Sequence, residues 1–503
     1  MTPSQLPLNE RVTANPEQPV QASARYVLYW MTAQRRTRAN FALERAVDWA
    51  RHLGRPLLVL EALAVDYEHA SDRLHRFVLD GMKDNAAACL RHGVRYLRYV
   101  EPRAGAGRGL VKALARHAAV VVTDDHPAHP LGDLAARLRP HLAVRLEQVD
   151  SCGLLPMRGT PKVFTTAYAF RRHLPHELPA HLASMPRDHP LRRLRSMPRA
   201  VVARSILTRW PELRADPSSD PTALLATLPI DHTVGAVAAT RGGSREARAR
   251  LTHFLAQGLE HYQDDRNHPG EECESGLSPY LHFGHVGSHE VFQAVVAREG
   301  WTPDDLDTVV RGKRAGWWGM APEAEAFLDQ VVTWRELAIN TCVHLPETYA
   351  SMASLPAWAL RTLHTHALDP RPYTYAPEEL EQGATHDAIW NAAQHQLRAQ
   401  GTIHNYLRML WGKKILEWSR SPDEALATMI HLNDKYALDG RDPNSYAGIL
   451  WCLGRNDRAW GPERPIFGTV RYMSSDQARK KLKLGSYLTR FTAAGSKPVG
   501  NAR

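Results

Sequence analysis

The chain has 503 residues, of which 44% are hydrophobic, and its formal net charge is +10. This composition excludes a disordered chain and predicts at least two domains with large cores. No apolar run approaches the length of a membrane span, so we expect no membrane association. The five scattered cysteines form no C-x-x-C, which argues against a zinc site or a disulfide framework and favours a reducing cytoplasm.

The N-terminal part predicts a flexible tail followed by an α/β domain. Residues 1–23 are polar and Pro-rich, whereas residues 24–174 alternate between short apolar runs and amphipathic stretches. Strands are predicted at 25–31, 55–63, 94–101, 119–125 and 141–150, and helices at 40–54, 71–93 and 109–118. This alternation predicts a doubly wound parallel sheet of Rossmann-like type. A dinucleotide site is unsupported, because no G-x-G-x-x-G is present.

The C-terminal part predicts an all-α domain. Residues 175–242 are rich in Pro, Arg, His and Ser and indicate a linker that wraps around the outside. Residues 243–490 have helical periodicity almost throughout, and residues 491–503 are predicted to be a second flexible tail.

Three segments of the helical part contain candidate functional residues. A Gly/Ser/Pro-rich loop precedes a helix, and there Arg266, Ser275 and Ser278 could hold phosphates, although an ordinary capped turn would look the same. Trp411 and Trp418 lie seven residues apart on one helical face, with Trp390 on the preceding helix. They form either an electron relay or simply core. The third segment, "LNDKYALDGRDPNSY", begins with Asn433 and includes Asp439. It is either a cap and turn or an edge that hydrogen-bonds a ring system.

The stretch "WCLGRNDRAWGPERPIFGTVRYM" (451–473) combines indoles, arginines, prolines and glycines in one irregular segment. Considered alone, it has three interpretations. It could be a docking loop in which Trp and Arg pack. It could be a nucleic-acid surface where Arg meets phosphate and Trp stacks on bases. It could also line a pocket for a large aromatic ligand.

Several motifs in one order resemble the class II cyclobutane pyrimidine dimer photolyases of the photolyase/cryptochrome superfamily. They are "SGLSPYLHFG", "WRELAIN", "HDAIWNAAQ", "LRMLWGKKILEWS", "LNDKYALDGRDPNSY" and "NDRAWGPERPIFGTVRYM". The resemblance covers most of residues 25–490. It implies an N-terminal α/β antenna domain and a C-terminal helical domain that binds FAD.

The resemblance also implies roles for individual residues. FAD would be bound by residues of the loop and of the two following motifs, namely Tyr262, Arg266, Ser275, Leu277, Ser278, Arg408, Asn433 and Asp439. Trp411, Trp390 and Trp418 would form the family's relay, with Trp411 nearest the flavin. Trp334 and Trp451 would line the dimer pocket. Arg455, Arg458 and Arg471 would hold DNA phosphates or structure the loop.

At some positions the chain departs from the family pattern. Gln330 stands where a glutamate usually contacts the damaged bases, and Asn456 replaces the histidine of "HDRxW". Leu410 precedes the first relay tryptophan, where a tyrosine is common.

The function implied is light-dependent DNA repair, in which an electron from photoexcited reduced FAD splits the dimer. The protein would be an enzyme that acts on UV-damaged DNA as a monomer, with a possible second antenna chromophore of unknown identity. The alternative is a photoreceptor or repurposed flavoprotein that keeps cofactor and relay without efficient repair. A third hypothesis is a basic nucleic-acid-binding protein without cofactor.

Overall fold

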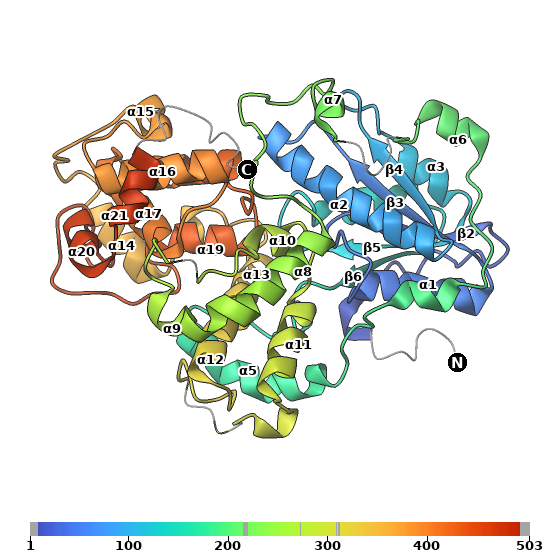
Figure 1. The fold of residues 1–503 in the computed structure, drawn as a ribbon, viewed down its shortest axis with the longest axis horizontal. Helices are drawn as coiled ribbons and strands as arrows, with labels where there is room; N and C mark the ends of the chain where they lie inside the picture. The colour runs from blue at the N-terminus through green and yellow to red at the C-terminus, as the bar shows by residue number, and fades with distance from the viewer. Residues whose placement is uncertain (1–8, 215–219, 272, 308, 310–311, 493–503) are drawn as a thin grey trace. The chain divides into compact units, whose positions relative to one another are not determined.

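The structure is a computed structural model that describes residues 9–214, 220–271, 273–307, 309 and 312–492 (Figure 1). It divides into two compact units. One contains the sheet and consists of residues 1–161, 174–252 and 276–306. The other is helical and consists of residues 162–173, 253–275 and 307–503. Among the described residues, no helix is both long and apolar enough to cross a bilayer.

The sheet unit is built on six strands in the order β1-β6-β5-β2-β3-β4. The strands are β1 (Val12–Ala14), β2 (Tyr26–Met31), β3 (Leu57–Leu63), β4 (Arg95–Val100), β5 (Ala118–Asp125) and β6 (Leu146–Asp150). Strands β2 to β6 pair in parallel, and β1 pairs antiparallel with β6 at one edge. The predicted fold class is confirmed. The prediction of a flexible tail over 1–23 does not hold for β1, whose Val12 pairs with Val149.

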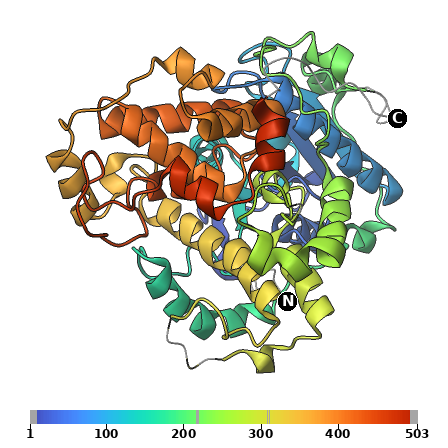
Figure 2. The ribbon, with the colours of Figure 1, turned by 60° about the vertical axis from the view of Figure 1, so that its left-hand side comes forward.

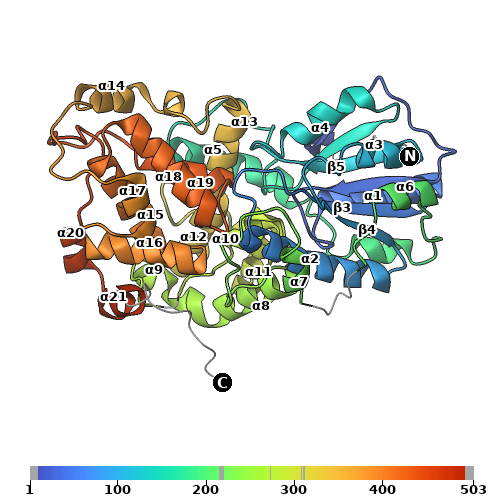
Figure 3. The same ribbon diagram turned by 90° about the horizontal axis from the view of Figure 1, so that it is seen from above.

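Helices cover both faces of the sheet (Figures 1 and 3). α1 (Phe41–Leu53) packs on the face that carries Val27 and Tyr29. It starts at Asn40, whose side chain accepts a hydrogen bond from the Leu43 N–H, and it stops at Gly54, where φ is 61°. α3 (Leu110–Ala115) and α6 (Arg204–Arg209) pack on the opposite face, which carries Leu28. The remaining helices of this unit are α2 (Asp72–Arg91), α4 (Asp133–Leu138), α7 (Thr222–Leu225), α8 (Ser244–His253), α10 (Ser278–His282) and α11 (Ser288–Glu299).

The predicted linker, 175–242, belongs to the sheet unit and contributes to the hydrophobic clusters on both faces of the sheet. Leu191 and Leu194 join the α1 face, and Ile206 and Trp210 join the opposite one. α5 (Ala167–Leu182) begins in the helical unit and ends in the sheet unit, with Pro175 inside the helix.

The carboxyl ends of the central strands are filled by the chain's own ionic groups. The order of strands reverses between β5 and β2, the place where open parallel sheets commonly bind ligands. There the Asp124 carboxylate accepts hydrogen bonds from the backbone N–H groups of Thr32, Ala33 and Gln34, at 2.8 to 2.9 Å. Three successive amides that could form an anion-binding nest are thereby taken by an internal carboxylate.

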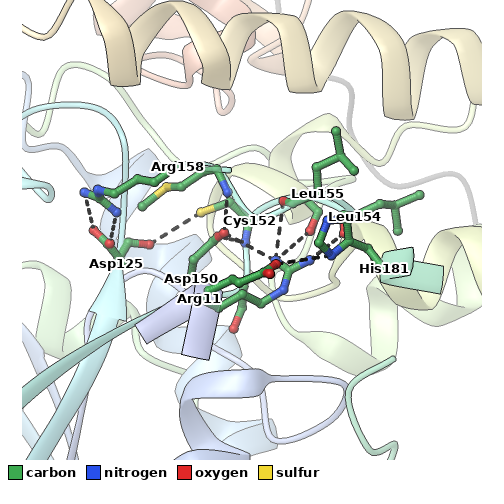
Figure 4. Close-up of polar contacts among 12 residues, drawn as sticks. Arg11, Asp125, Asp150, Cys152, Leu154, Leu155, Arg158 and His181 are labelled. Atoms are coloured by element: carbon green, nitrogen blue, oxygen red, sulfur yellow. Dashed lines mark hydrogen bonds and ion pairs between the residues drawn. The ribbon is translucent and has the colours of Figure 1, made fainter. Parts of the chain in front are cut away.

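The last residues of β5 and β6, Asp125 and Asp150, are buried carboxylates that meet arginines (Figure 4). Arg11 pairs with Asp150 at 3.3 Å and also donates to the carbonyl of Gly153, while Arg158 pairs with Asp125. Burial raises the pKa of Asp125 to about 6, which Arg158 opposes. These pairs fix the segment after β6 to the sheet.

The helical unit has three short helices around a π-helical turn and a larger set of packed helices. The first group is α9 (Tyr262–Asp265), α12 (Pro322–Leu328) and α13 (Arg335–His344), with the π-helical turn η8 (Asp329–Trp334) between α12 and α13. The second group is α14 (Ala357–Thr365), α15 (Pro377–Gln382), α16 (Ala388–Gln400), α17 (Asn405–Trp418), α18 (Pro422–Tyr436), α19 (Pro443–Trp451), α20 (Ser475–Lys481) and α21 (Gly485–Thr492). Helix α16 packs against α17 and α21, as the turned view shows (Figure 2).

Candidate functional site

Three tryptophans form a continuous ring chain across α16 and α17. The centroids of Trp411 and Trp390 are 6.5 Å apart with nearly parallel planes, and those of Trp390 and Trp418 are 5.4 Å apart at 71°. All three side chains are buried. The structure therefore brings the predicted residues together in the order Trp411, Trp390, Trp418.

Hydrogen bonds fix two of these rings. The indole N–H of Trp390 donates to the carbonyl of Trp411 at 3.0 Å, and that of Trp411 donates to Gln394 Oε1 at 2.9 Å. Asp387 caps α16 by accepting from the N–H groups of Ile389 and Trp390, which sets the start of the helix. The rings are thus held in one arrangement, as stepwise electron transfer requires.

A buried polar cluster joins the last turn of α18 to the first turn of α19. The Asn433 amide donates to Asp434 Oδ1 at 2.9 Å and to Ser445 Oγ at 2.7 Å. Asp434 also accepts from the hydroxyl of Tyr446 at 3.1 Å. Burial raises the pKa of Tyr446, with the Asp434 carboxylate acting in the same direction, so the phenol keeps its proton. Buried polar groups in this density suit the polar edge of a flat ring system.

The other residues predicted to bind the cofactor lie in both units. Arg408 pairs with Asp439 at 3.2 Å, and Arg266 lies 5.6 Å from the ring centroid of Tyr262. Burial raises the pKa of Tyr262 to about 12. Ser275 ends a segment of the helical unit. Leu277 and Ser278 belong to the sheet unit, where Ser278 begins α10.

A cavity of about 410 Å³ lies within the helical unit, and aromatic and basic side chains dominate its lining. The aromatic residues are Tyr406, Trp451, Trp460 and Tyr472, and the basic ones are Arg464, Arg471 and Lys481. Met409 and Gln477 also contribute. Flat apolar walls beside cations favour a ligand with aromatic rings and negative charge.

The arginines of the 451–473 stretch have different roles. Arg471 pairs with Asp457 at 2.9 Å, and its guanidinium carbon lies 3.8 Å from the Trp460 ring centroid. Arg458 is exposed and lies 4.2 Å from the same centroid. Arg455 is buried, where it donates to the carbonyl of Tyr349 and, at 3.0 Å, to Ser354 Oγ. Of the two roles expected for Arg455, these contacts fit the structuring of the loop.

Gln330 and Trp334 both lie on the π-helical turn η8, and both are half-buried. Neither is among the residues that line the cavity. The turn is held by Asp329, which pairs with Arg171 at 2.8 Å, and the Arg171 guanidinium carbon lies 5.9 Å from the Trp334 ring centroid. Single π-helical turns are frequent at functional sites.

Sequence reasoning missed much of the cavity lining. Trp460, Arg464 and Tyr472 lie inside the quoted 451–473 stretch, so its unusual composition was a usable signal. Tyr406 and Met409 precede Trp411 on α17, and helical spacing alone does not tell that they face a cavity.

Comparison with known proteins identifies relatives along nearly the whole chain. A deoxyribodipyrimidine photo-lyase from Methanothermobacter thermautotrophicus is 34% identical over 467 residues, which are 93% of this chain and 94% of that protein. One from Oryza sativa subsp. japonica is 32% identical and covers 92% of this chain and 87% of its own. No family model matches the sequence.

Solved structures share the fold at lower identity. A class III photolyase from Agrobacterium tumefaciens superimposes with a TM-score of 0.66 at 18% identity and covers 93% of this chain and 86% of its own. A cryptochrome from Synechocystis gives 0.65 at 14% identity, with coverage of 93% and 88%.

Proposed function

The chain belongs to the deoxyribodipyrimidine photo-lyase family, and we propose that it is a class II member that splits cyclobutane pyrimidine dimers in UV-damaged DNA under light. The observation that carries this proposal is the presence, in one helical unit, of the buried Trp411–Trp390–Trp418 chain and of an aromatic, basic cavity. The first suits electron transfer, and the second suits a nucleic acid with exposed bases.

FAD is the cofactor that this proposal requires, and the donor set of the polar cluster fits it. Within the helical unit, Asn433, Arg408 and Asp439 would hold the ring system, and Arg266 with Ser275 would hold the phosphates. When bound and reduced, FAD supplies a light-driven one-electron donor. Trp418, Trp390 and Trp411 would pass electrons along the buried ring chain toward it.

The cavity residues would bind the damaged DNA. Trp451 would offer a flat face against which an extruded pyrimidine stacks, at about 1–3 kcal/mol per base. Because a dimer already distorts the helix, its extrusion costs less than that of an intact pair. Arg464 and Lys481 are exposed at the cavity and would contact phosphates.

A photoreceptor without efficient repair is the second candidate. Gln330 and Asn456 favour it, because they replace a glutamate and a histidine of the family pattern that the sequence resembles. Both candidates require the flavin and the tryptophan chain, so only the reaction on damaged DNA separates them.

The test is illumination of the purified, reduced protein with an oligonucleotide that contains one thymine dimer, followed by chromatography of the product. We expect restored thymines in the light and none in the dark. Bound flavin without any loss of dimer would favour the photoreceptor. A folded protein that takes up no FAD on reconstitution would exclude both candidates.

A further inference from the structure

A fully buried lysine stands behind the cavity wall. Lys413 lies on α17 with no exposed side-chain surface, and its ammonium donates to the carbonyl of Cys452 at 2.7 Å, just past the end of α19. The preceding residue, Gly412, makes this possible. A Cβ there would lie 2.6 Å from Cys452 Sγ and 3.0 Å from Met429 Sδ, so only glycine lets α17 pack so closely.

The ammonium of Lys413 lies over the indole of Trp451, 5.0 Å from the ring centroid. Trp451 lines the cavity, and Lys413 does not. A cation in this position is attracted by the ring's quadrupole, most strongly where water is excluded. Lys413 therefore restrains Trp451 through two contacts, namely the hydrogen bond to the carbonyl of the next residue, Cys452, and the cation–π contact with the Trp451 indole.

The neighbouring lysine shows that this arrangement is unusual. Lys414 also lies over an indole, 5.6 Å from the centroid of Trp418, but it pairs with Glu417 at 2.7 Å. The Cys452 thiol and the Asp457 carboxylate favour the charged form of Lys413. Asp457 is already paired with Arg471, and the Arg471 guanidinium disfavours that charged form. Burial of an ammonium with so little compensation costs stability, and an apolar side chain would avoid that cost.

We propose that Lys413 is the positioning residue that fixes the indole of Trp451 as the wall against which the cavity holds a pair of linked pyrimidines. This inference rests on the proposed function. Its consequence is pH-dependent selectivity, because burial lowers the pKa of Lys413 to about 8. The charged form of Lys413 holds the ring below that pH, and above it this contact is lost, whereas the Arg471 guanidinium carbon still lies 5.5 Å from the same ring centroid.

The experiment measures binding in the dark between pH 6.5 and 9.5. Affinities are compared for an oligonucleotide with one thymine dimer and for the same oligonucleotide undamaged. For the wild type we expect the preference for damage to fall by about tenfold over this range, a change of about 1.4 kcal/mol. Lys413→Met is expected to show the reduced preference at every pH, and Lys414→Met, the matched control, is expected to behave like the wild type.

A second measurement needs neither DNA nor flavin. Tryptophan fluorescence of the protein should change between pH 7 and 9, and this step should be missing in Lys413→Met and in Trp451→Phe. If the step is present but no oligonucleotide preference exists at any pH, the proposed function fails and the coupling of Lys413 to Trp451 stands.

Other outcomes overturn the inference itself. The inference fails if the wild-type protein prefers the damaged oligonucleotide equally at every pH. It also fails if the preference of Lys413→Met depends on pH as that of the wild type does. If Lys413→Met does not fold, the wild-type profile and the fluorescence of Trp451→Phe still decide, since neither needs that variant.

Discussion

At the scale of single residues, Trp411 is the first step of the proposed electron path. We expect Trp411→Phe to slow or abolish light-driven reduction of the flavin without releasing it. The change leaves Gln394 Oε1 without its indole partner, which costs about 1–3 kcal/mol of unfolding free energy. Absorbance under steady illumination measures the reduction rate. Trp301→Phe, a buried tryptophan of the sheet unit, is the control, and an equal effect there would refute the assignment.

Gln330, which lies on the turn η8 and does not line the cavity, tests whether a carboxylate at this position would contact the damaged bases. Hydrogen bonds to charged groups contribute about 1.5–3 kcal/mol, and a neutral amide keeps part of this. We therefore expect weak but measurable repair in the wild type, and a gain in dimer affinity or in quantum yield for Gln330→Glu. Gln263→Glu makes the same charge change at an exposed position of α9. A loss of repair in Gln330→Glu would show that this residue does not correspond to the dimer-contacting glutamate.

At the scale of elements, the loop between α10 and α11 is packed into the sheet unit. Gly284 has a φ of 68°, and a Cβ there would lie 2.1 Å from the Ala33 carbonyl. His285 follows, fully buried, and accepts a hydrogen bond from the Gly243 N–H at 2.9 Å. Its ring is therefore neutral, and burial, with Arg35 and His282 acting in the same direction, lowers its pKa to about 3.

Because His285 is buried in its neutral form, we expect the free energy of unfolding to fall in acid. The unfolded chain has a histidine pKa near 6.5, so the folded state binds fewer protons between pH 6.5 and 3. The stabilisation is fully present above pH 6.5 and is lost as the pH falls toward 3, by up to about 1.4 kcal/mol per pH unit. Denaturant unfolding at pH 7 and pH 5 measures the loss. His285→Gln keeps an acceptor and should reduce it, and an unchanged slope would contradict the assignment.

Most elements follow from periodicity, and the exceptions have physical reasons. The apolar runs that became β2 to β6 and the amphipathic stretches that became α1 and α2 were predicted, because each buries a full face. β1 was missed because three residues among polar neighbours have too short a pattern. The helix α5 was missed because Pro175 and Pro179, which usually end helices, lie inside it.

The candidate site was predictable only where spacing or composition marks it. The seven-residue interval between Trp411 and Trp418 indicated that both lie on one face of a helix. In the structure both rings contact Trp390 of α16. Lys413 gave no such signal. "GKK" looks like solvated charge in a sequence, yet both lysines are buried, and the close approach of α17 to α19 at Gly412 leaves Lys413 with no exposed surface.

At the scale of the whole molecule, the net charge of +10 predicts salt-sensitive DNA binding. Each phosphate contact contributes a slope of about −0.9 in log affinity against log salt. Lys481→Ala should reduce that slope by about one contact, because Lys481 is exposed at the cavity. Arg455→Ala should leave the slope unchanged and lower the unfolding free energy by about 1–3 kcal/mol, since it removes the hydrogen bonds that the buried guanidinium donates to the Tyr349 carbonyl and to Ser354 Oγ. Equal slopes for wild type and Lys481→Ala would contradict the first expectation.

The Asp124 carboxylate limits which ligands can bind at the carboxyl ends of the central strands. Sheets of this topology commonly present free amides at the reversal point, and phosphates of abundant metabolites bind there. Here those amides already bind Asp124, so a free nucleotide would have to displace a covalently tethered competitor of the same charge. A phosphate therefore meets three amides that are already occupied, and any ligand of the sheet unit must be recognised by means other than a phosphate at this position.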